Sequence, residues 1–214
     1  MTQPTQGFDV LILSERRAIL SPIRTILRAL CLIAVVALPT VVSNASASAG
    51  GVTCPVVYWG SLPKVVDGSG PTESIFNVRT GQHPCYDRFV IDIDGSGPVG
   101  YDVSYVENVY TEGQGSVVAL AGGAKIQIIA HAPNFDTDTG VITYTPIDQE
   151  QSQQLTNVAG YRTFRQVAFA GSFEGQTTFG LGVRARLPMR AFVLSGPGTG
   201  QRLIVDVAHR WGSF

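Results

Sequence analysis

Motifs that indicate catalysis or metal binding are missing from this chain. It contains no Gly-x-Ser-x-Gly nucleophile elbow, no His-x-x-x-His pair and no Cys-x-x-Cys pair. The three histidines, His83, His131 and His209, are dispersed, whereas a zinc site needs several convergent ligands. We therefore predict no catalytic residue, no metal and no cofactor, and we interpret each histidine as a polar surface or strand-end residue.

The 3.6-residue spacing of apolar residues that is typical of α-helices is almost absent as well. Charged residues make up only 14% of the chain. Apolar and polar residues alternate instead, in short runs broken by Gly, Pro, Asp and Asn, which is typical of β-strands. The runs predicted as strands are 74–80, 88–94, 101–109, 116–120, 125–131, 163–170, 178–187, 189–194 and 202–208. The pattern predicts an all-β fold, an antiparallel β-sandwich or flattened barrel of about eight to nine short strands.

Long hydrophobic runs are limited to residues 29–42, which are 14 in number. A membrane-spanning helix needs about 20 such residues. Arginines precede this run and small residues follow it at 45–49, which is the order of a secretory signal peptide. We expect export by the general secretory route, with cleavage after Ala47 or Ala49 and no stable membrane span afterwards. A twin-arginine signal and a retained anchor are the alternatives.

Removal of residues 1–49 changes the charge balance. It takes away four of the 15 basic and two of the 16 acidic residues, which leaves 11 and 14 and a net charge of −3. Such a balance predicts no basic patch, so nucleic acid is not an expected partner. The remaining 165 residues are the size of one domain and are enough to bury a core.

Two of the three cysteines lie beyond the predicted signal, Cys54 and Cys85. An even number of cysteines in an exported chain predicts a disulfide, which would close a loop of about 30 residues and stabilise the fold by about 3–4 kcal/mol. It would fasten an irregular segment, 50–72, to the main domain, 73–214. A metal site built from both thiols and His83 is the alternative.

The cleanest alternation, at 178–187, places Arg184 and Arg186 on the same face as Gly180 and Gly182. Glycines on a sheet face let another backbone or a polymer approach closely, and arginines bind carboxylate or phosphate groups. We interpret this face as a candidate ligand-binding surface, although the polar face of an antiparallel strand has the same pattern. Three tyrosines could stack against a glycan or peptide there: Tyr86, Tyr101 and Tyr105.

Other polar residues have simpler interpretations. Asp92 and Asp206 are expected to form cross-strand ion pairs with Arg88, Arg165 or Arg202. The aspartates at 92–97 and 136–140 are spaced like part of a calcium loop but lack its remaining ligands, so both segments are interpreted as turns or loops. In the segment 58–63, we expect Trp59 and Leu62 to pack onto the domain as an apolar lid.

Seven short motifs occur in a characteristic order. They are Trp59-Gly-Ser-Leu, Val78-Arg-x-Gly-x-His83, Asp87-Arg-Phe-Val, Gly100-Tyr-Asp-Val-x-Tyr, Phe173-Glu-Gly175, Gly182-Val-Arg-x-Arg and Arg202-Leu-Ile-Val-Asp-Val-Ala-His209. Together they resemble the AMIN-like domain of actinobacterial secreted proteins and lipoproteins. That domain is similar to the AMIN module found beside cell-wall amidases, a non-catalytic β-sandwich that places its owner at the cell wall.

The resemblance implies an exported, non-catalytic domain of the cell envelope that binds peptidoglycan or another cell-wall polymer. Two other functions stay open at this point. The first is a protein-interaction or assembly module whose partner is another envelope protein. The second is a hydrolase acting on wall material, which would need a cleft with His83 or His209 beside a carboxylate.

Overall fold

The computed structural model describes residues 54–68 and 74–212, which lie within one compact unit, Ala49–Phe214. The predicted signal peptide, residues 1–49, lies outside the described residues. Within the described ranges, no helix is long and apolar enough to cross a membrane.

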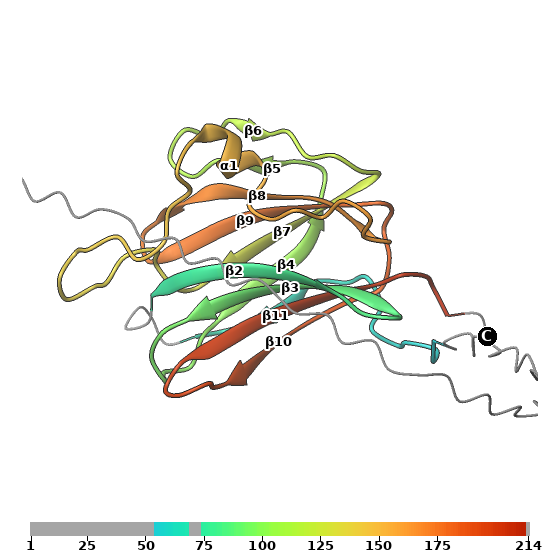
Figure 1. The fold of residues 1–214 in the computed structure, drawn as a ribbon, viewed down its shortest axis with the longest axis horizontal. Helices are drawn as coiled ribbons and strands as arrows, with labels where there is room; N and C mark the ends of the chain where they lie inside the picture. The colour runs from blue at the N-terminus through green and yellow to red at the C-terminus, as the bar shows by residue number, and fades with distance from the viewer. Residues whose placement is uncertain (1–53, 69–73, 213–214) are drawn as a thin grey trace, which may run out of the picture. The chain divides into compact units, whose positions relative to one another are not determined.

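Two antiparallel sheets pack face to face as a sandwich, so the predicted fold class is confirmed (Figure 1). The first sheet has the order β1-β4-β7-β9-β8 and the second the order β10-β11-β3-β2. The strands of the first sheet are β1 (Lys64–Val66), β4 (Tyr101–Val106), β7 (Ala124–Ala130), β9 (Gln176–Val183) and β8 (Phe164–Phe173). Those of the second are β10 (Met189–Ser195), β11 (Gln201–Ala208), β3 (Tyr86–Ile93) and β2 (Ile75–Gln82).

The core lies between the sheets and is built from alternate residues of each strand. Phe89 of β3 and Phe179 of β9 meet edge to face across it, with ring centroids 5.7 Å apart. Around them the inner faces contribute buried aliphatic side chains, among them Ile91, Ile93, Ile126, Ile128, Leu181, Leu203 and Val205. Complete burial of one such side chain contributes about 1.5–3 kcal/mol, so this layer dominates the stability of the fold.

A small outer layer covers part of the five-stranded sheet. It consists of the ribbon β5 (Val109–Tyr110) and β6 (Val117–Val118) and, beside β8, the short helix α1 (Gln149–Gln153). Its polypeptide lies directly on the predicted glycine face, because a Cβ atom on Gly182 would fall 2.1 Å from the carbonyl oxygen of Ala121. The close approach that the glycines permit is therefore made by the protein's own backbone.

The structure differs from the predicted strands in three places. Strand β1 was not predicted, and Lys64–Val66 is a strand in a segment expected to be irregular. The predicted strand 101–109 divides into β4 and the start of β5, which pairs with β6 in a separate ribbon. Strand β9 ends at Val183 rather than at residue 187. There the chain leaves the first sheet to reach the second, and the backbone N–H of Arg184 donates to the carbonyl of Thr163 at 2.8 Å. Leu62 does not pack as a lid, because 71% of it is exposed.

Candidate functional site

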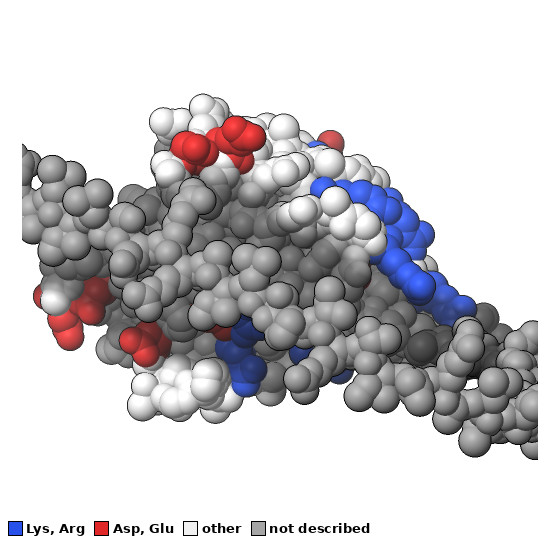
Figure 2. All heavy atoms as spheres, viewed as in Figure 1, with Lys and Arg blue, Asp and Glu red and all other residues white. Residues whose placement is uncertain are grey.

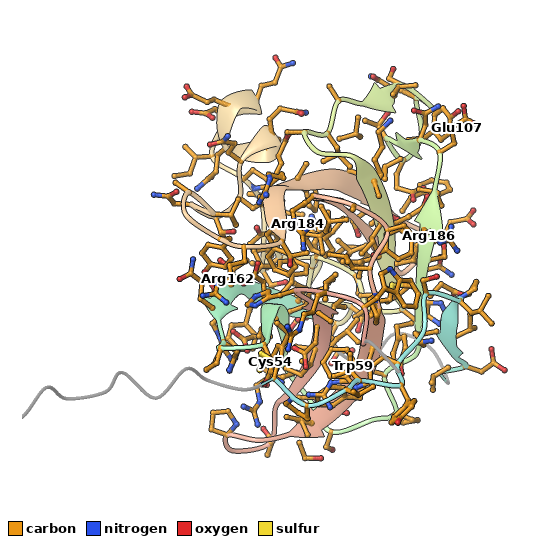
Figure 3. The ribbon with its side chains drawn as sticks, turned by 90° about the vertical axis from the view of Figure 1, so that its right-hand side faces the viewer. Cys54, Trp59, Glu107, Arg162, Arg184 and Arg186 are labelled. Atoms are coloured by element: carbon orange, nitrogen blue, oxygen red, sulfur yellow. A yellow bond between two sulfur atoms is a disulfide. The ribbon has the colours of Figure 1, made fainter. Side chains whose placement is uncertain are left out.

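Five exposed arginines lie at one end of the sandwich, where hydrogen bonds connect their segments. Figure 3 views this end and labels three of them, Arg162, Arg184 and Arg186. The five come from the loop before β8, the first residues of β8, the bend after β9 and the chain after β11: Arg162, Arg165, Arg184, Arg186 and Arg210. We call this set the arginine end. In Figure 2, Lys and Arg atoms lie along the right-hand flank and also at the lower centre, and Asp and Glu atoms lie mainly at the left and the top.

Uncharged oxygen atoms hold the side chains of Arg184 and Arg186 in place. The Nε atom of Arg184 donates to the carbonyl of Arg162 at 3.2 Å, and its Nη2 atom donates to the carbonyl of His209. Arg186 donates from Nε to the Ser61 hydroxyl at 3.1 Å and from Nη2 to the Ser61 carbonyl at 3.0 Å. Because a guanidinium carries further N–H donors, both arginines keep part of their donor capacity.

Carboxylates pair with other arginines of the domain. Asp206 is fully buried between Arg88, at 2.6 Å, and Arg190, at 2.8 Å. Among the described residues, none of the five arginines of the arginine end forms a salt bridge with a carboxylate. The prediction of a surface without a basic patch is therefore wrong at this end. Net charge says nothing about where the charges lie, and the loops collect cations that are far apart in sequence.

Buried Asp87 joins the elements that carry these arginines. Its Oδ2 atom accepts hydrogen bonds from the backbone N–H groups of Thr163, at 2.6 Å, and Phe164, at 3.1 Å. Its Oδ1 atom lies 3.0 Å from Nε2 of His209. One carboxylate on β3 therefore positions both the loop that bears Arg162 and the chain that leads into Arg210.

The structure separates the three tyrosines proposed as stacking surfaces. Tyr101 is only 5% exposed, and its hydroxyl donates to the carbonyl of Ala191 at 2.9 Å. The prediction that Tyr101 is a binding surface is therefore wrong, because the pleat turns its ring into the core. Tyr105 is half-buried, and the guanidinium of Arg186 lies 4.9 Å from its ring centroid. Burial raises the pKa of Tyr105, which the Leu187 hydrogen bond and the Arg186 charge oppose.

Tyr86 lies on the outer face of the second sheet. Its ring stacks on His83 with centroids 4.4 Å apart and meets Trp59 edge to face at 5.7 Å. Arg190 lies 4.3 Å from the Trp59 centroid, so Trp59 packs onto the domain as predicted. These rings enclose the Asp206 ion pairs, and the hydrogen bond with Asp206 is the main cause of the raised pKa of Arg88.

The cross-strand ion pairs were predicted correctly in kind but only partly in membership. Asp206 does pair with Arg88, its direct neighbour across β11 and β3. The partners Arg190 of Asp206 and Arg79 of Asp92 were missed, because strand register is not visible in a single sequence. No described carboxylate pairs with either of the other predicted partners, Arg165 and Arg202.

The predicted disulfide is confirmed. Cys54 and Cys85 are bonded, with their Cα atoms 5.3 Å apart. The bridge fastens the segment before β1 to the start of β3, close to the arginine end. The thiols are therefore not available to His83 as metal ligands.

The two aspartate-rich segments meet at the opposite end of the sandwich. Asp94, Asp136 and Asp138 line a common cavity of about 310 Å³. The carboxylate of Asp136 accepts hydrogen bonds from Thr139 and Asp138, which lowers its pKa. In the part of the chain that the structure describes, no group of three or more His, Cys, Asp and Glu side chains could hold a metal ion.

His209 meets one of the two conditions that a hydrolytic site would need. It lies beside the carboxylate of Asp87, but it is only 9% exposed. Its other ring nitrogen, Nδ1, is buried without a hydrogen-bond partner. The pair is therefore enclosed by protein, and its visible role is to position the surrounding loops.

The comparisons with known proteins identify a family. A model of the AMIN-like domain matches residues 73–209, which includes every strand from β2 to β11. Neither the curated proteins nor the solved structures include a significant match to the chain. The family suggests a cell-wall-associated binding module, and such domains are generally non-catalytic. By this match and its β-sandwich fold, the chain belongs to the AMIN-like domain family.

Proposed function

We propose that this protein is an exported, non-catalytic module that binds peptidoglycan or another anionic polymer of the cell wall at its arginine end. One observation carries the proposal. Five exposed arginines converge there, and within the described ranges no carboxylate neutralises any of them. The AMIN-like family membership supports a wall component as the ligand.

Binding at the arginine end would depend on many weak contacts rather than on one strong contact. An exposed ion pair contributes only about 0.2–1 kcal/mol, so a single anionic group would bind weakly. A wall polymer repeats its carboxylate or phosphate groups along the chain, and linked contacts raise the overall affinity far above that of each contact alone. Guanidinium groups suit both anions, because their N–H donors match the two oxygens of a carboxylate or phosphate.

Sedimentation with purified cell-wall sacculi tests the proposal. Wild-type protein is expected in the pellet at low ionic strength and increasingly in the supernatant as salt screens the charges. Arg162→Gln is the cleanest variant, because its exposed side chain makes no described hydrogen bond or ion pair, and it should bind more weakly. Arg202→Gln removes the same charge from the second sheet and should bind like wild type.

Two results would refute the proposal. One is wild-type protein that stays in the supernatant at every salt concentration. The other is equal loss of binding in Arg162→Gln and Arg202→Gln, because binding would then depend on net charge alone. Short duplex DNA as a competitor shows whether any polyanion replaces the wall polymer.

A second candidate function rests on the edge of the five-stranded sheet. Strand β1 is the edge strand there, and Leu62, Val65 and Val66 beside its open edge are exposed. Exposed apolar residues at a strand edge favour pairing with another protein. Cross-linking in cells would support this function if it captured one defined envelope protein and if Val65→Lys abolished the capture.

A further inference from the structure

We propose that a groove beside Arg186 binds a zwitterionic amino-acid group, that is, one ligand carrying both an ammonium and a carboxylate. If the proposed function holds, the source of this group is the peptide part of the wall polymer. The groove has a volume of about 500 Å³ and lies where β4 ends and β7 begins. Its lining is Tyr105, Val106, Glu107, Gly122, Gly123, Ala124, Lys125 and Arg186.

The cationic side of the groove is built and held in place. Arg186 is fixed by its two bonds to Ser61 and by the ring of Tyr105, 4.9 Å from the guanidinium carbon. The Nζ atom of Lys125 donates to the Glu107 carbonyl and to Oδ1 of Asn108, both at 2.9 Å. All of these acceptors are uncharged, so both cations keep their full charge for a ligand carboxylate.

The anionic side is Glu107. Its side chain is exposed, and among residues 54–68 and 74–212 no cation forms a salt bridge with its carboxylate. Glu107 and Arg186 therefore line one groove with opposite charges and form no salt bridge with each other. Figure 3 labels both residues on the same side of the domain. A simple anion would be repelled by Glu107, whereas a ligand with both charges can satisfy the two sides.

Two of the lining residues are glycines that pack against the protein's own backbone. A Cβ atom on Gly122 would fall 2.4 Å from the carbonyl oxygen of Val183, and one on Gly123 would fall 2.6 Å from that of Arg184. Gly122 also has a φ angle of +114°, which other residues rarely adopt. At both positions a side chain is excluded by the protein's own backbone, so the chain from Gly122 to Gly123 packs closely against the end of β9 and fixes this wall of the groove.

A titration followed by NMR tests the groove with three probes: dialanine, N-acetyl-dialanine and dialanine amide. Dialanine should cause saturable shifts at Gly122 and Gly123. Each modified probe lacks one charge and should bind up to about fivefold more weakly, which is the upper end of the effect of one exposed ion pair. Glu107→Gln should weaken dialanine by the same factor and strengthen N-acetyl-dialanine, because the repulsion of its lone carboxylate is removed, whereas the distant, exposed Glu174→Gln should change neither.

The inference is overturned if dialanine causes no saturable shift, or if acetylation and Glu107→Gln have no effect. A further arm identifies the source of the ligand. Dialanine that releases the protein from sacculi assigns the groove to the peptide of the wall, and dialanine that binds without release assigns it to soluble peptides. If the wild-type protein binds dialanine but not sacculi, the proposed function is refuted. If it binds sacculi but not dialanine, the proposed ligand of the groove is refuted.

Discussion

Loss of the Cys54–Cys85 disulfide should lower the free energy of unfolding by about 3–4 kcal/mol on the chain-entropy model. The bonded residues are 31 positions apart, and a closed loop of that length removes about 12 cal/mol/K of entropy from the unfolded chain. At 25 °C this corresponds to about 3.7 kcal/mol. Since small domains have unfolding free energies of about 5–15 kcal/mol, the bridge provides a large share of the total.

The folded state should change little, because other contacts also hold the segment around Cys54. The backbone N–H of Met189 donates to the Gly60 carbonyl at 2.8 Å, and Trp59 packs against Arg190. Strand β1 remains paired with β4. The destabilisation should therefore come mainly from the freedom gained by the unfolded chain.

Urea unfolding with and without a reductant measures this effect. Wild-type protein should show a lower midpoint in reductant, and a Cys54→Ser/Cys85→Ser variant should show that lower midpoint under both conditions. An unchanged wild-type midpoint, with reduction verified by a count of free thiols, would contradict the reasoning. The entropic stabilisation would then be absent or cancelled by strain in the folded state.

Three further predictions concern polar groups that are buried or partly buried. Asp206→Asn should lower the unfolding free energy by about 3–5 kcal/mol in urea denaturation, because it leaves Arg88 and Arg190 without their buried carboxylate; a change below about 1 kcal/mol would contradict this. Asp87→Ala should lower the unfolding free energy by at least about 2 kcal/mol by the same measurement, since two backbone N–H groups lose their acceptor. It should also weaken sacculus binding, because the arginine end loses its support. Full wall binding by the variant would argue against that support. Burial raises the pKa of Tyr144 from 10.0 to about 12, so its neutral form is favoured by folding, and this stabilisation should be complete below pH 10 and lost as pH rises towards 12. Tyr144→Phe, which does not titrate, should flatten this part of the stability curve between pH 10 and 12, and an identical curve for the two proteins would refute the assignment.

The local alternation of apolar and polar residues was sufficient to predict most of the strands. The side-chain period of a strand is set by neighbouring residues, so the alternation around Phe89 and Phe179 could be recognised without a structure. The end of β9 could not be recognised from the sequence, because Arg184 to Arg186 continue the same alternation after the backbone has left the sheet. Strand β1 was missed because three residues carry too little pattern and its pairing depends on β4.

The sequence by itself determined the all-β class, the pairing of two cysteines and the likeness to the AMIN-like family, because each follows from local periodicity, a count or ordered motifs. It also singled out Arg184 and Arg186. Only the tertiary structure decided that Arg162, Arg165 and Arg210 join them, that Tyr101 is buried, and that Glu107 faces the same groove as Arg186. Those facts depend on which loops meet at one end of a sandwich, and that is set by strand order and register rather than by neighbours in the chain.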